Sequence, residues 1–539
     1  MLSYRKLAMR VLGRPLHTEG IDSPRPASQR AAAFILTAAM LTTLAAPAFA
    51  DIWHIENGDI TISAGESGNN VTQNNNTTYG DTNTIITNQN KDTASSHTVT
   101  IEAKDKDDKV EVTLKDVNID TSSRNKAAVS VTGEGDTNIK LDGDNALKSD
   151  IYRSGIYGSG SLTISGGEND SLTAQGGSGA NGISSSGSLT ISGGTVTANG
   201  DDGGRGISSS GSVTISGGST VTANGGSGTI SGGDGIWSGG GVTISGGSTV
   251  TANGGNGGSL VGGDGIRSGG GLTVSDGTVT AKGGNGDSKD GYGGDGIRSG
   301  GVVTISGNTV NAAGGYGGKV GGYGICSFDR VAISGGTVEA AGGNGSTGGG
   351  SGIYSSVIDL SGSLELTAKA GSPNGKALSQ KGSELVLDTI KDKLGPGAKV
   401  TATDADGKVI DQVSTPRPVE PEESSSSSDG GSSAPSAPVS SLPGLTVTDK
   451  SGAVISYTST QSGNTLTVCV GRLTASFRIS LAALRQLRAE GIETITFQTI
   501  LCSTTLSVDE LLAMGGEDTE VVLTHHIRSS TLTVGGKAV

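Results

Sequence analysis

Apolar and polar residues alternate within short phrases that recur eight times between residues 155 and 353. In residues 212–216, Val213 and Ile215 point to one side of an extended chain, whereas the polar residues around them point to the other. This period of two predicts a half-buried β-strand. Each repeat opens with a Gly-Ile pair, and successive pairs lie 24 to 31 residues apart. A period of that length indicates a solenoid, a propeller or another array of repeats.

Three short strands are predicted in each repeat. The first carries the Gly-Ile pair, the second a Leu or Val with an Ile, and the third a single Val, as in residues 206–208, 213–216 and 220–224. Gly-Gly and Asn-Gly pairs separate the strands, and we expect them to supply the positive φ angles of the corners. A propeller blade needs four strands. The sequence therefore predicts an all-β fold, a right-handed parallel β-helix with three short strands per coil.

Stacked coils place equivalent residues next to each other, about 4.8 Å apart. The inward positions then form apolar columns along the axis, and these columns are the predicted core. One column holds the isoleucine of every Gly-Ile pair: Ile156, Ile183, Ile207, Ile236, Ile266, Ile297, Ile325 and Ile353. At one corner, Asn199, Asn224 and Asn253 should form a column of hydrogen-bonded amides.

Less regular segments flank the regular coils, which occupy residues 151–370. Residues 51–150 contain strand-like phrases of uneven spacing, and we expect them to form an N-terminal cap and irregular first coils. Residues 371–413 lose the regular repeat in the same way and are expected to be C-terminal coils or a cap. The physical reason is that an open solenoid end exposes unpaired strand edges and has to be covered.

The chain changes character after the coils. Residues 414–443 are a Ser/Pro-rich linker with almost nothing to bury. In residues 444–539, alternating strands accompany a helical pattern at 481–488 that ends before Gly491. This last segment is predicted to be a small α+β domain of unknown role.

The first 50 residues predict export. Six basic residues precede an apolar run at residues 31–44, and Ala48, Phe49 and Ala50 fit a small-x-small cleavage site, so residues 1–50 are expected to be a signal peptide. The apolar run is short for a membrane span, and no span is expected after cleavage, although a retained anchor is the alternative. The expected location is extracellular, either secreted or associated with the cell surface.

Net charge limits the class of partner. The whole chain carries −14, and its first 50 residues hold six basic and two acidic groups, which leaves −18 for the exported part. Such a negative protein repels a phosphate backbone, so nucleic acid is not an expected partner.

The residue after each Gly-Ile pair points outward. These residues form a solvent-facing column that is unusual because it contains aromatic and basic side chains. The column reads Tyr157, Ser184, Ser208, Trp237, Arg267, Arg298, Cys326 and Tyr354. Trp237, Arg267 and Arg298 follow one another in successive coils, an arrangement suited to stacking a sugar ring and pairing an anionic group. These three, with Tyr157 and Tyr354, are the predicted carbohydrate-binding residues, and an acidic polysaccharide is the favoured partner.

Two positions before the same isoleucine, Asp234, Asp264 and Asp295 form a second column in three successive coils. Carboxylates one coil apart repel each other unless a positive charge intervenes. Calcium is the candidate cofactor, because it favours oxygen ligands and tolerates irregular geometry. The alternative, which we favour, is that Arg267 and Arg298 neutralise the column as surface ion pairs.

The repeats resemble a known class of protein. Phrases such as residues 235–238 followed by 242–247 are similar to those of exported bacterial β-helix proteins that carry a carbohydrate-binding repeat domain, over roughly residues 51–370. The resemblance implies binding of acidic plant polysaccharides of the pectin type, with calcium in some members. Relatives of these proteins are described as surface adhesins.

Catalysis has little support in the sequence, because only five histidines occur and no Ser, His and Asp grouping stands out. We therefore predict a non-catalytic carbohydrate-binding protein. One alternative is a surface adhesin or a stalk that presents the C-terminal domain. Another is a calcium-dependent polysaccharide lyase, in which the aspartates hold calcium and Arg267 or Arg298 accepts the proton, a role that rests on fold-level analogy alone.

Overall fold

The computed structural model describes residues 51–416, 444–448, 455, 457–462, 464–470, 474–499, 503–516, 519–525, 530–535 and 537–538. The predicted signal peptide and nearly all of the predicted linker lie outside the described residues. The chain divides into two compact units, Met1–Pro421 and Glu422–Val539. No helix within the described part of the chain has the length and apolarity needed to cross a bilayer.

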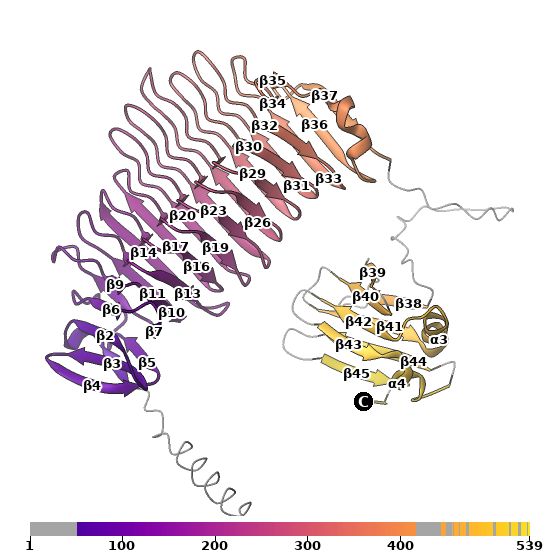
Figure 1. Ribbon diagram of the computed structural model, residues 1–539, viewed down its shortest axis with the longest axis horizontal. Helices are drawn as coiled ribbons and strands as arrows, with labels where there is room; N and C mark the ends of the chain where they lie inside the picture. The colour runs from indigo at the N-terminus through magenta and orange to yellow at the C-terminus, as the bar shows by residue number, and fades with distance from the viewer. Residues whose placement is uncertain are drawn as a thin grey trace, which may run out of the picture. The chain divides into compact units, whose positions relative to one another are not determined.

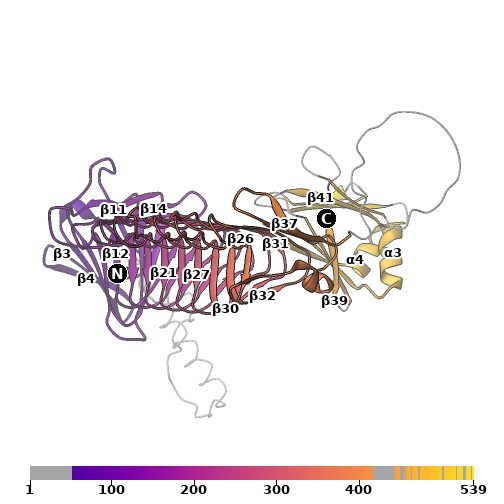
Figure 2. The ribbon, with the colours of Figure 1, turned by 90° about the horizontal axis from the view of Figure 1, so that it is seen from above.

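The first unit is a parallel β-helix of about 13 turns, which confirms the predicted fold class. One coil runs through β18 (Ile207–Ser209), β19 (Val213–Ser216) and β20 (Thr220–Asn224). Each strand pairs in parallel with its counterpart in the next coil, so that Ile207 lies opposite Ile236. Figure 1 shows this stacking, and in Figure 2 the first strands β21 and β27 lie along one face while the third strands β14, β26 and β31 lie along another.

The same arrangement of three strands repeats in successive coils along the axis. The first strands are β9 (Val129–Gly133), β12 (Ile156–Gly158), β15 (Ile183–Ser185), β18, β21 (Ile236–Ser238), β24 (Ile266–Ser268), β27 (Ile297–Ser299), β30 (Ile325–Ile333), β32 (Ile353–Leu360) and β34 (Leu378–Gln380). The second strands are β10 (Asp136–Asp142), β13 (Ser161–Ser165), β16 (Leu189–Ser192), β19, β22 (Val242–Ile244), β25 (Leu272–Val274) and β28 (Val303–Ile305), and β30 and β32 continue into this position. The third strands are β8 (Asn118–Asp120), β11 (Asp144–Lys148), β14 (Ser171–Ser178), β17 (Thr195–Asp201), β20, β23 (Ser248–Asn253), β26 (Gly277–Lys282), β29 (Thr309–Ala313), β31 (Gly336–Ala341), β33 (Leu364–Lys369) and β36 (Lys399–Thr403).

The predicted inward columns form the core. All eight isoleucines of the Gly-Ile pairs are fully buried in one continuous cluster, and each stabilises the fold by about 1.5–3 kcal/mol. The amide column is also confirmed, since Asn224 Nδ2 donates to Asn199 Oδ1 at 2.8 Å and Asn253 Nδ2 donates to Asn224 Oδ1 at 2.9 Å.

A buried serine column was not predicted. A serine stands two positions after every isoleucine of the Gly-Ile pairs except Ile156, and it points inward, as Ser209, Ser238, Ser268 and Ser299 do. Ser268 Oγ donates to the carbonyl of Gly240 in the preceding coil, at 3.0 Å. The column thereby gives each inward-pointing hydroxyl a carbonyl acceptor at the corner after the first strand.

A stack of glycine-rich loops connects the third strand of one coil to the first strand of the next. We call it the glycine fin, and it comprises residues 225–234, 254–264, 283–295, 314–323 and 342–351. The two arms of each loop pair alternately with each other and with the neighbouring loops: Gly263 N–H donates to Gly255 O, Gly284 N–H to Gly263 O and Gly294 N–H to Gly284 O, each at 2.8 Å. Figure 1 shows the longest loops of the solenoid as stacked arcs along one side.

Glycine is required at the corners for two different reasons, a positive φ angle and close approach of the backbone. The sequence predicts positive φ angles at both the Gly-Gly and the Asn-Gly corners. In the Gly-Gly corners, Gly246 and Gly247 adopt φ angles of 63° and 71°, as expected. At the Asn-Gly corners the expectation was wrong, because Gly225 and Gly254 do not have left-handed φ angles. Glycine is required there by close approach: a Cβ on Gly225 would lie 1.9 Å from the carbonyl oxygen of Gly233.

Antiparallel strands cover both ends of the solenoid. At the N-terminal end these are β2 (Ile60–Gly65), β3 (Gly68–Gln73) and β4 (Asn76–Asp81), which accompany β1 (Ile52–His54), η1 (Ile55–Asn57), β5 (Thr84–Thr87), β6 (Val99–Ala103) and β7 (Lys109–Lys115). At the other end, β37 (Val409–Ser414) runs antiparallel to β36, and β35 (Ser383–Glu384) runs antiparallel to β34. The 3-10 helix η2 (Leu387–Lys393) buries Leu387 and Ile390 against the last coils.

The second unit has its own core, in which Phe477 and Phe497 are fully buried. The helix expected at residues 481–488 is α3 (Leu481–Ala489), capped by Ser480, whose Oγ accepts the N–H of Ala483. Two sheets accompany α3 and α4 (Val508–Leu512). One contains β38 (Leu445–Thr448), β41 (Ala475–Ser480), β44 (Glu520–His525), β45 (Ser530–Val534) and β46 (Lys537–Ala538), and the other β39 (Thr458–Ser462), β40 (Thr465–Cys469), β42 (Thr494–Gln498) and β43 (Ser503–Ser507).

Candidate functional site

The outward column is continuous in the structure. Trp237 lies opposite Arg267, and Arg267 lies opposite Arg298, in the parallel ladder of β21, β24 and β27. Tyr354 follows Arg298 two coils later, beyond Cys326. Tyr157 precedes Trp237 by three coils, about 14 Å along the axis. The structure therefore brings Trp237, Arg267 and Arg298 together and leaves the two tyrosines apart from them.

Two aromatic rings in this column, those of Trp237 and Tyr354, stack against other side chains of the protein. The guanidinium of Arg205 lies 4.4 Å from the ring centroid of Trp237, and Tyr323 stacks on Tyr354 with centroids 4.9 Å apart. One face of the Trp237 ring is thus covered by the protein itself. A ligand contacts the ring edges and the guanidinium groups more readily than a free indole face, which the sequence reading had not anticipated.

Cys326 departs from the expected solvent face, because its side chain is buried although it follows a Gly-Ile pair. Burial, followed by the charge of Asp295, raises the pKa of its thiol to about 12. A thiol with so high a pKa is unreactive at neutral pH. Cys326 therefore contributes packing to this face.

The aspartate column is buried, contrary to the expected surface position. Asp234, Asp264 and Asp295 are only 6%, 5% and 4% exposed. Each Oδ1 accepts a backbone N–H from the next coil: Asp264 N–H donates to Asp234 at 2.9 Å, Asp295 N–H to Asp264 at 2.7 Å and Tyr323 N–H to Asp295 at 2.7 Å. The column is thus a carboxylate ladder that accepts backbone N–H groups where the glycine fin joins the first strand, while the main-chain carbonyls of the same aspartates accept N–H groups from the preceding coil.

Three arginines pair with the other carboxylate oxygens. Arg298 Nη1 lies 3.3 Å from Asp295 Oδ2, and Arg267 Nη1 lies 4.0 Å from Asp264 Oδ2, as the favoured alternative predicted. Arg205 Nε lies 3.3 Å from Asp234 Oδ2, a pair that the sequence reading missed. Its signal was present, because Arg205 occupies the same repeat position as the three aspartates one coil earlier.

Burial shifts the titration of this cluster. Burial, followed by the charges of Asp295 and Asp234, raises the pKa of Asp264 well above its usual range. Burial also raises the pKa of Asp295 to about 6, although the Tyr323 N–H and Arg298 oppose the rise. Although burial alone would lower it, the carboxylates of Asp295 and Asp264 raise the pKa of Arg298 above its ordinary value. The arginines therefore stay charged while part of the aspartate column takes up protons in mildly acidic solution.

The donor set does not match a calcium site as it stands. Each aspartate has one oxygen on a backbone N–H and the other directed to a guanidinium, so no carboxylate offers two free oxygens. Among the residues that the structure describes, no group of three or more His, Cys, Asp and Glu side chains is arranged to hold a metal ion. Calcium stays a hypothesis that binding experiments have to test.

A groove of about 550 Å³ runs along the foot of the glycine fin beside these residues. Its walls are the fin glycines on one side and the charged side chains on the other: Arg205, Asp234, Asp264, Arg267 and Arg298 line it, with Asn181 at one end. Three guanidinium groups from the coils of β18, β24 and β27 therefore border one elongated hollow. Such a row suits a linear chain that carries regularly spaced anions.

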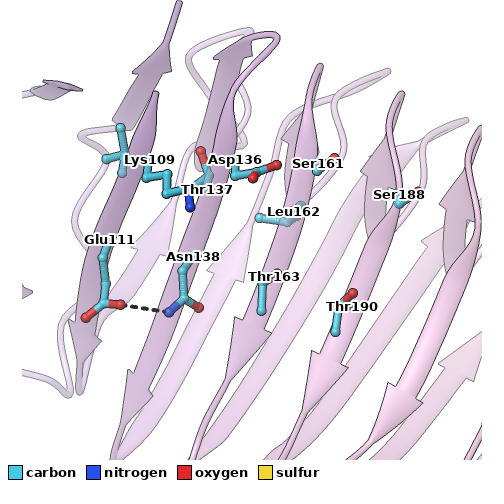
Figure 3. Close-up of a pocket in the computed structure, with 11 residues that line it drawn as sticks. Lys109, Glu111, Asp136, Thr137, Asn138, Ser161, Leu162, Thr163, Ser188 and Thr190 are labelled. Atoms are coloured by element: carbon cyan, nitrogen blue, oxygen red, sulfur yellow. Dashed lines mark hydrogen bonds between the residues drawn. The ribbon is translucent and has the colours of Figure 1, made fainter. Parts of the chain in front are cut away.

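A second hollow, of about 430 Å³, lies on the outer face of β7, β10, β13 and β16. Figure 3 shows its side chains in two rows, which are Lys109, Asp136, Ser161 and Ser188, and then Glu111, Asn138, Thr163 and Thr190. Asn138 Nδ2 donates to Glu111 Oε2 at 3.0 Å. With two carboxylates and one ammonium group, this hollow is less suited to an anion than the groove along the fin.

The carboxylate ladder gives a stability prediction. The Asp264→Asn variant should be more stable than the wild type at neutral pH by roughly 1 kcal/mol or more, because it removes a buried charge between Asp234 and Asp295. The ladder hydrogen bond survives, since Asn181 Oδ1 already accepts the N–H of Arg205 in the same way at 2.8 Å. Urea unfolding of the full-length protein, followed by circular dichroism, measures the change.

The sign of the pH dependence follows from the raised pKa values. A carboxyl whose pKa is higher in the folded than in the unfolded protein binds more protons when folded, so the contribution of Asp264 to stability falls as the pH rises from the usual carboxyl range through its raised pKa. The stability advantage of Asp264→Asn should therefore shrink as the pH is lowered through this range. An advantage that is constant, or that grows in acid, would contradict the buried-charge explanation.

Comparison with protein-family models, with curated proteins and with solved structures finds no match. The fold and the groove therefore have to be interpreted from their own geometry.

Proposed function

We propose that this protein is a non-catalytic, exported or cell-surface β-solenoid that binds an acidic polysaccharide. The observation that carries the proposal is the row formed by Arg205, Arg267 and Arg298, which border one groove in line with the solenoid axis. A guanidinium pairs with a carboxylate in a planar, bidentate geometry, and an extended polymer can repeat that contact. Trp237 adds an apolar edge beside the charged row.

The chemistry of the groove favours binding over turnover. A lyase needs a group that can accept a proton, whereas an arginine retains its proton in proteins, and the neighbouring carboxylates hold the Arg298 pKa above its ordinary value. The resemblance of the repeats to carbohydrate-binding β-helix proteins supports the same function. Export belongs to the proposal as well and requires a separate test, and calcium-mediated binding is the alternative that a chelator tests.

The test compares polygalacturonate with its fully methyl-esterified form, which has the same backbone without the negative charges. The full-length protein should bind the acid form, and Trp237→Ala, Arg267→Ala and Arg298→Ala together should weaken binding roughly a hundredfold or more. To avoid unpaired buried carboxylates, the three changes are made in an Asp264→Asn, Asp295→Asn background, and that background alone is the control. Affinity electrophoresis measures retardation by each polymer.

An exposed arginine outside the groove provides a second control. Arg330 lies on β30 and pairs with Asp359 at 3.9 Å, so Arg330→Ala removes the same charge without changing the groove. Unchanged binding in the multiple variant, or equal loss in Arg330→Ala, would refute the site assignment. Failure of the wild type to bind any polysaccharide would refute the function.

A surface adhesin or presenting stalk is the second candidate, and one observation favours it. The tips of the glycine fin expose a row of large apolar side chains in successive coils, with Ile230 60% and Leu260 54% exposed and Tyr292, whose N–H donates to the carbonyl of Leu260, in the next coil. Exposed apolar rows are typical of protein contact surfaces. Under this alternative the tips, and not the arginine groove, would carry binding.

A further inference from the structure

A third groove, of about 660 Å³, lies at the N-terminal end of the same outward column. Thr100 on β6, Ser130 on β9, Tyr157 on β12 and Ser184 on β15 lie in direct register from coil to coil. They form the floor together with the neighbouring Thr98 and Thr132, and the turns before β9 and β12 supply the wall. The volume is within the range of sites that hold small ligands.

The wall of this groove is positively charged. Lys126 and Arg153 occupy equivalent positions, three residues before Val129 and Ile156, so they lie one coil apart. Among the described residues that line the groove, these are the charged ones, and none is acidic. Lys126 Nζ pairs with Asp59 at 3.0 Å, whereas the Arg153 side chain is exposed and its Nε donates to Asn125 Oδ1 at 3.3 Å. In a protein of net charge −14, such a wall favours an anionic ligand.

Tyr152 stands at a corner position where the fold imposes a left-handed backbone conformation that tyrosine does not suit. Its φ angle is 59°, and the equivalent positions in the neighbouring coils are held by Asn125 at 53°, Gly179 at 75° and Gly203 at 81°. Those residues suit the left-handed region, whereas a bulky tyrosine is an outlier there. The Tyr152 side chain is nevertheless 78% exposed at the rim of the groove. A strained, exposed aromatic residue is a candidate for ligand contact.

We infer that this groove is a second subsite for the anionic polysaccharide, with Arg153 and Lys126 contacting a sugar carboxylate and Tyr152 and Tyr157 contacting the ring. The inference rests on the proposed function, because the ligand class is the same. It extends that function because it predicts that the ligand is long enough to reach both grooves. From Thr100 to Arg298 the column advances seven coils, about 34 Å, so a polymer that follows the face meets both grooves.

Two linked subsites should make binding depend on chain length. A polymer that spans both subsites gains affinity because the second contact is intramolecular, and such gains can reach a hundredfold or more. Isothermal titration calorimetry of the full-length protein with a galacturonate trimer should give two molecules bound per protein. Polygalacturonate should bind at least tenfold more tightly than the trimer.

Variants at the rim test the assignment. Tyr152→Gly together with Arg153→Ala should reduce trimer stoichiometry from two to one and remove the affinity gain of the polymer. Glycine suits the left-handed angle and both side chains are exposed, so the solenoid should stay folded, which circular dichroism checks. Tyr79→Ala is the matched control, because Tyr79 is 77% exposed on β4 and does not line the groove.

The outcomes separate this inference from the proposed function. Unchanged stoichiometry in the Tyr152 and Arg153 variant, with the trimer still bound, would overturn the second subsite and leave the arginine groove in place. Complete loss of binding in that variant alone would support this groove and overturn the arginine groove. A wild type that binds neither trimer nor polymer overturns both.

Discussion

Gly284→Ala should destabilise the solenoid by about 3 kcal/mol or more, although it adds a single methyl group in a loop outside the apolar core. A Cβ at this position would lie 2.0 Å from the carbonyl oxygen of Gly255 and 2.5 Å from its carbonyl carbon, both in the neighbouring loop. Gly284 also donates to Gly263 and accepts from Gly294. Movement of its backbone would therefore break hydrogen bonds on both sides.

Gly247→Ala provides the matched comparison. Gly247 has a left-handed φ of 71°, but no atom lies within 4 Å of an added Cβ. The expected cost is the conformational one, about 1–2 kcal/mol. The midpoint of urea unfolding should consequently fall much more for Gly284→Ala than for Gly247→Ala. Equal effects would show that the glycine fin does not pack as tightly as the structure indicates.

Affinity for an acidic polysaccharide should rise, by about tenfold, when the pH is lowered from about 8 to about 5. Burial raises the pKa of Asp295 to about 6, and raises that of Asp264 well above its usual range. At a pH above these raised pKa values, the ionised aspartates neutralise Arg267 and Arg298. At a pH below them, the aspartates are protonated and the arginines retain uncompensated charge. Uronate carboxyls, which titrate near the usual carboxyl range, stay ionised over most of this interval.

Calcium-mediated binding would have the opposite pH dependence, because the metal needs ionised carboxylates. An affinity that falls as the pH is lowered, or that disappears with a chelator, would assign the anion contact to calcium instead of the arginines. The double variant Asp264→Asn, Asp295→Asn serves as the control. It should bind at neutral pH as tightly as the wild type does in acid, and its affinity should change little with pH.

The solenoid was predictable from the sequence because alternation and repeat length are local signals. The inward position of Ile236, its register with Ile266 and the helix after Ser480 all follow from periodicity and capping. The glycine fin was not predictable in the same way. Glycine carries no side-chain pattern, so the tight packing around Gly225 is visible only once neighbouring coils are in place.

The candidate site was predicted in part. The column of Trp237, Arg267 and Arg298 follows from register alone, and so does the position of the aspartates. The burial of Asp264 was missed because it arises only when neighbouring coils stack, and long-range contacts of that kind leave no local signal. The stacking of Arg205 on Trp237 depends on side-chain direction across coils, which the repeat pattern does not specify.

Equilibrium binding of the full-length protein to polygalacturonate and to its methyl ester tests the central claim most directly. Isothermal titration calorimetry at mildly acidic pH, first with calcium and then with a chelator, compares the two polymers under the same conditions. The arginine groove predicts binding of the acid form under both conditions and little binding of the ester. Equal binding of the two polymers, or binding of neither, would contradict it.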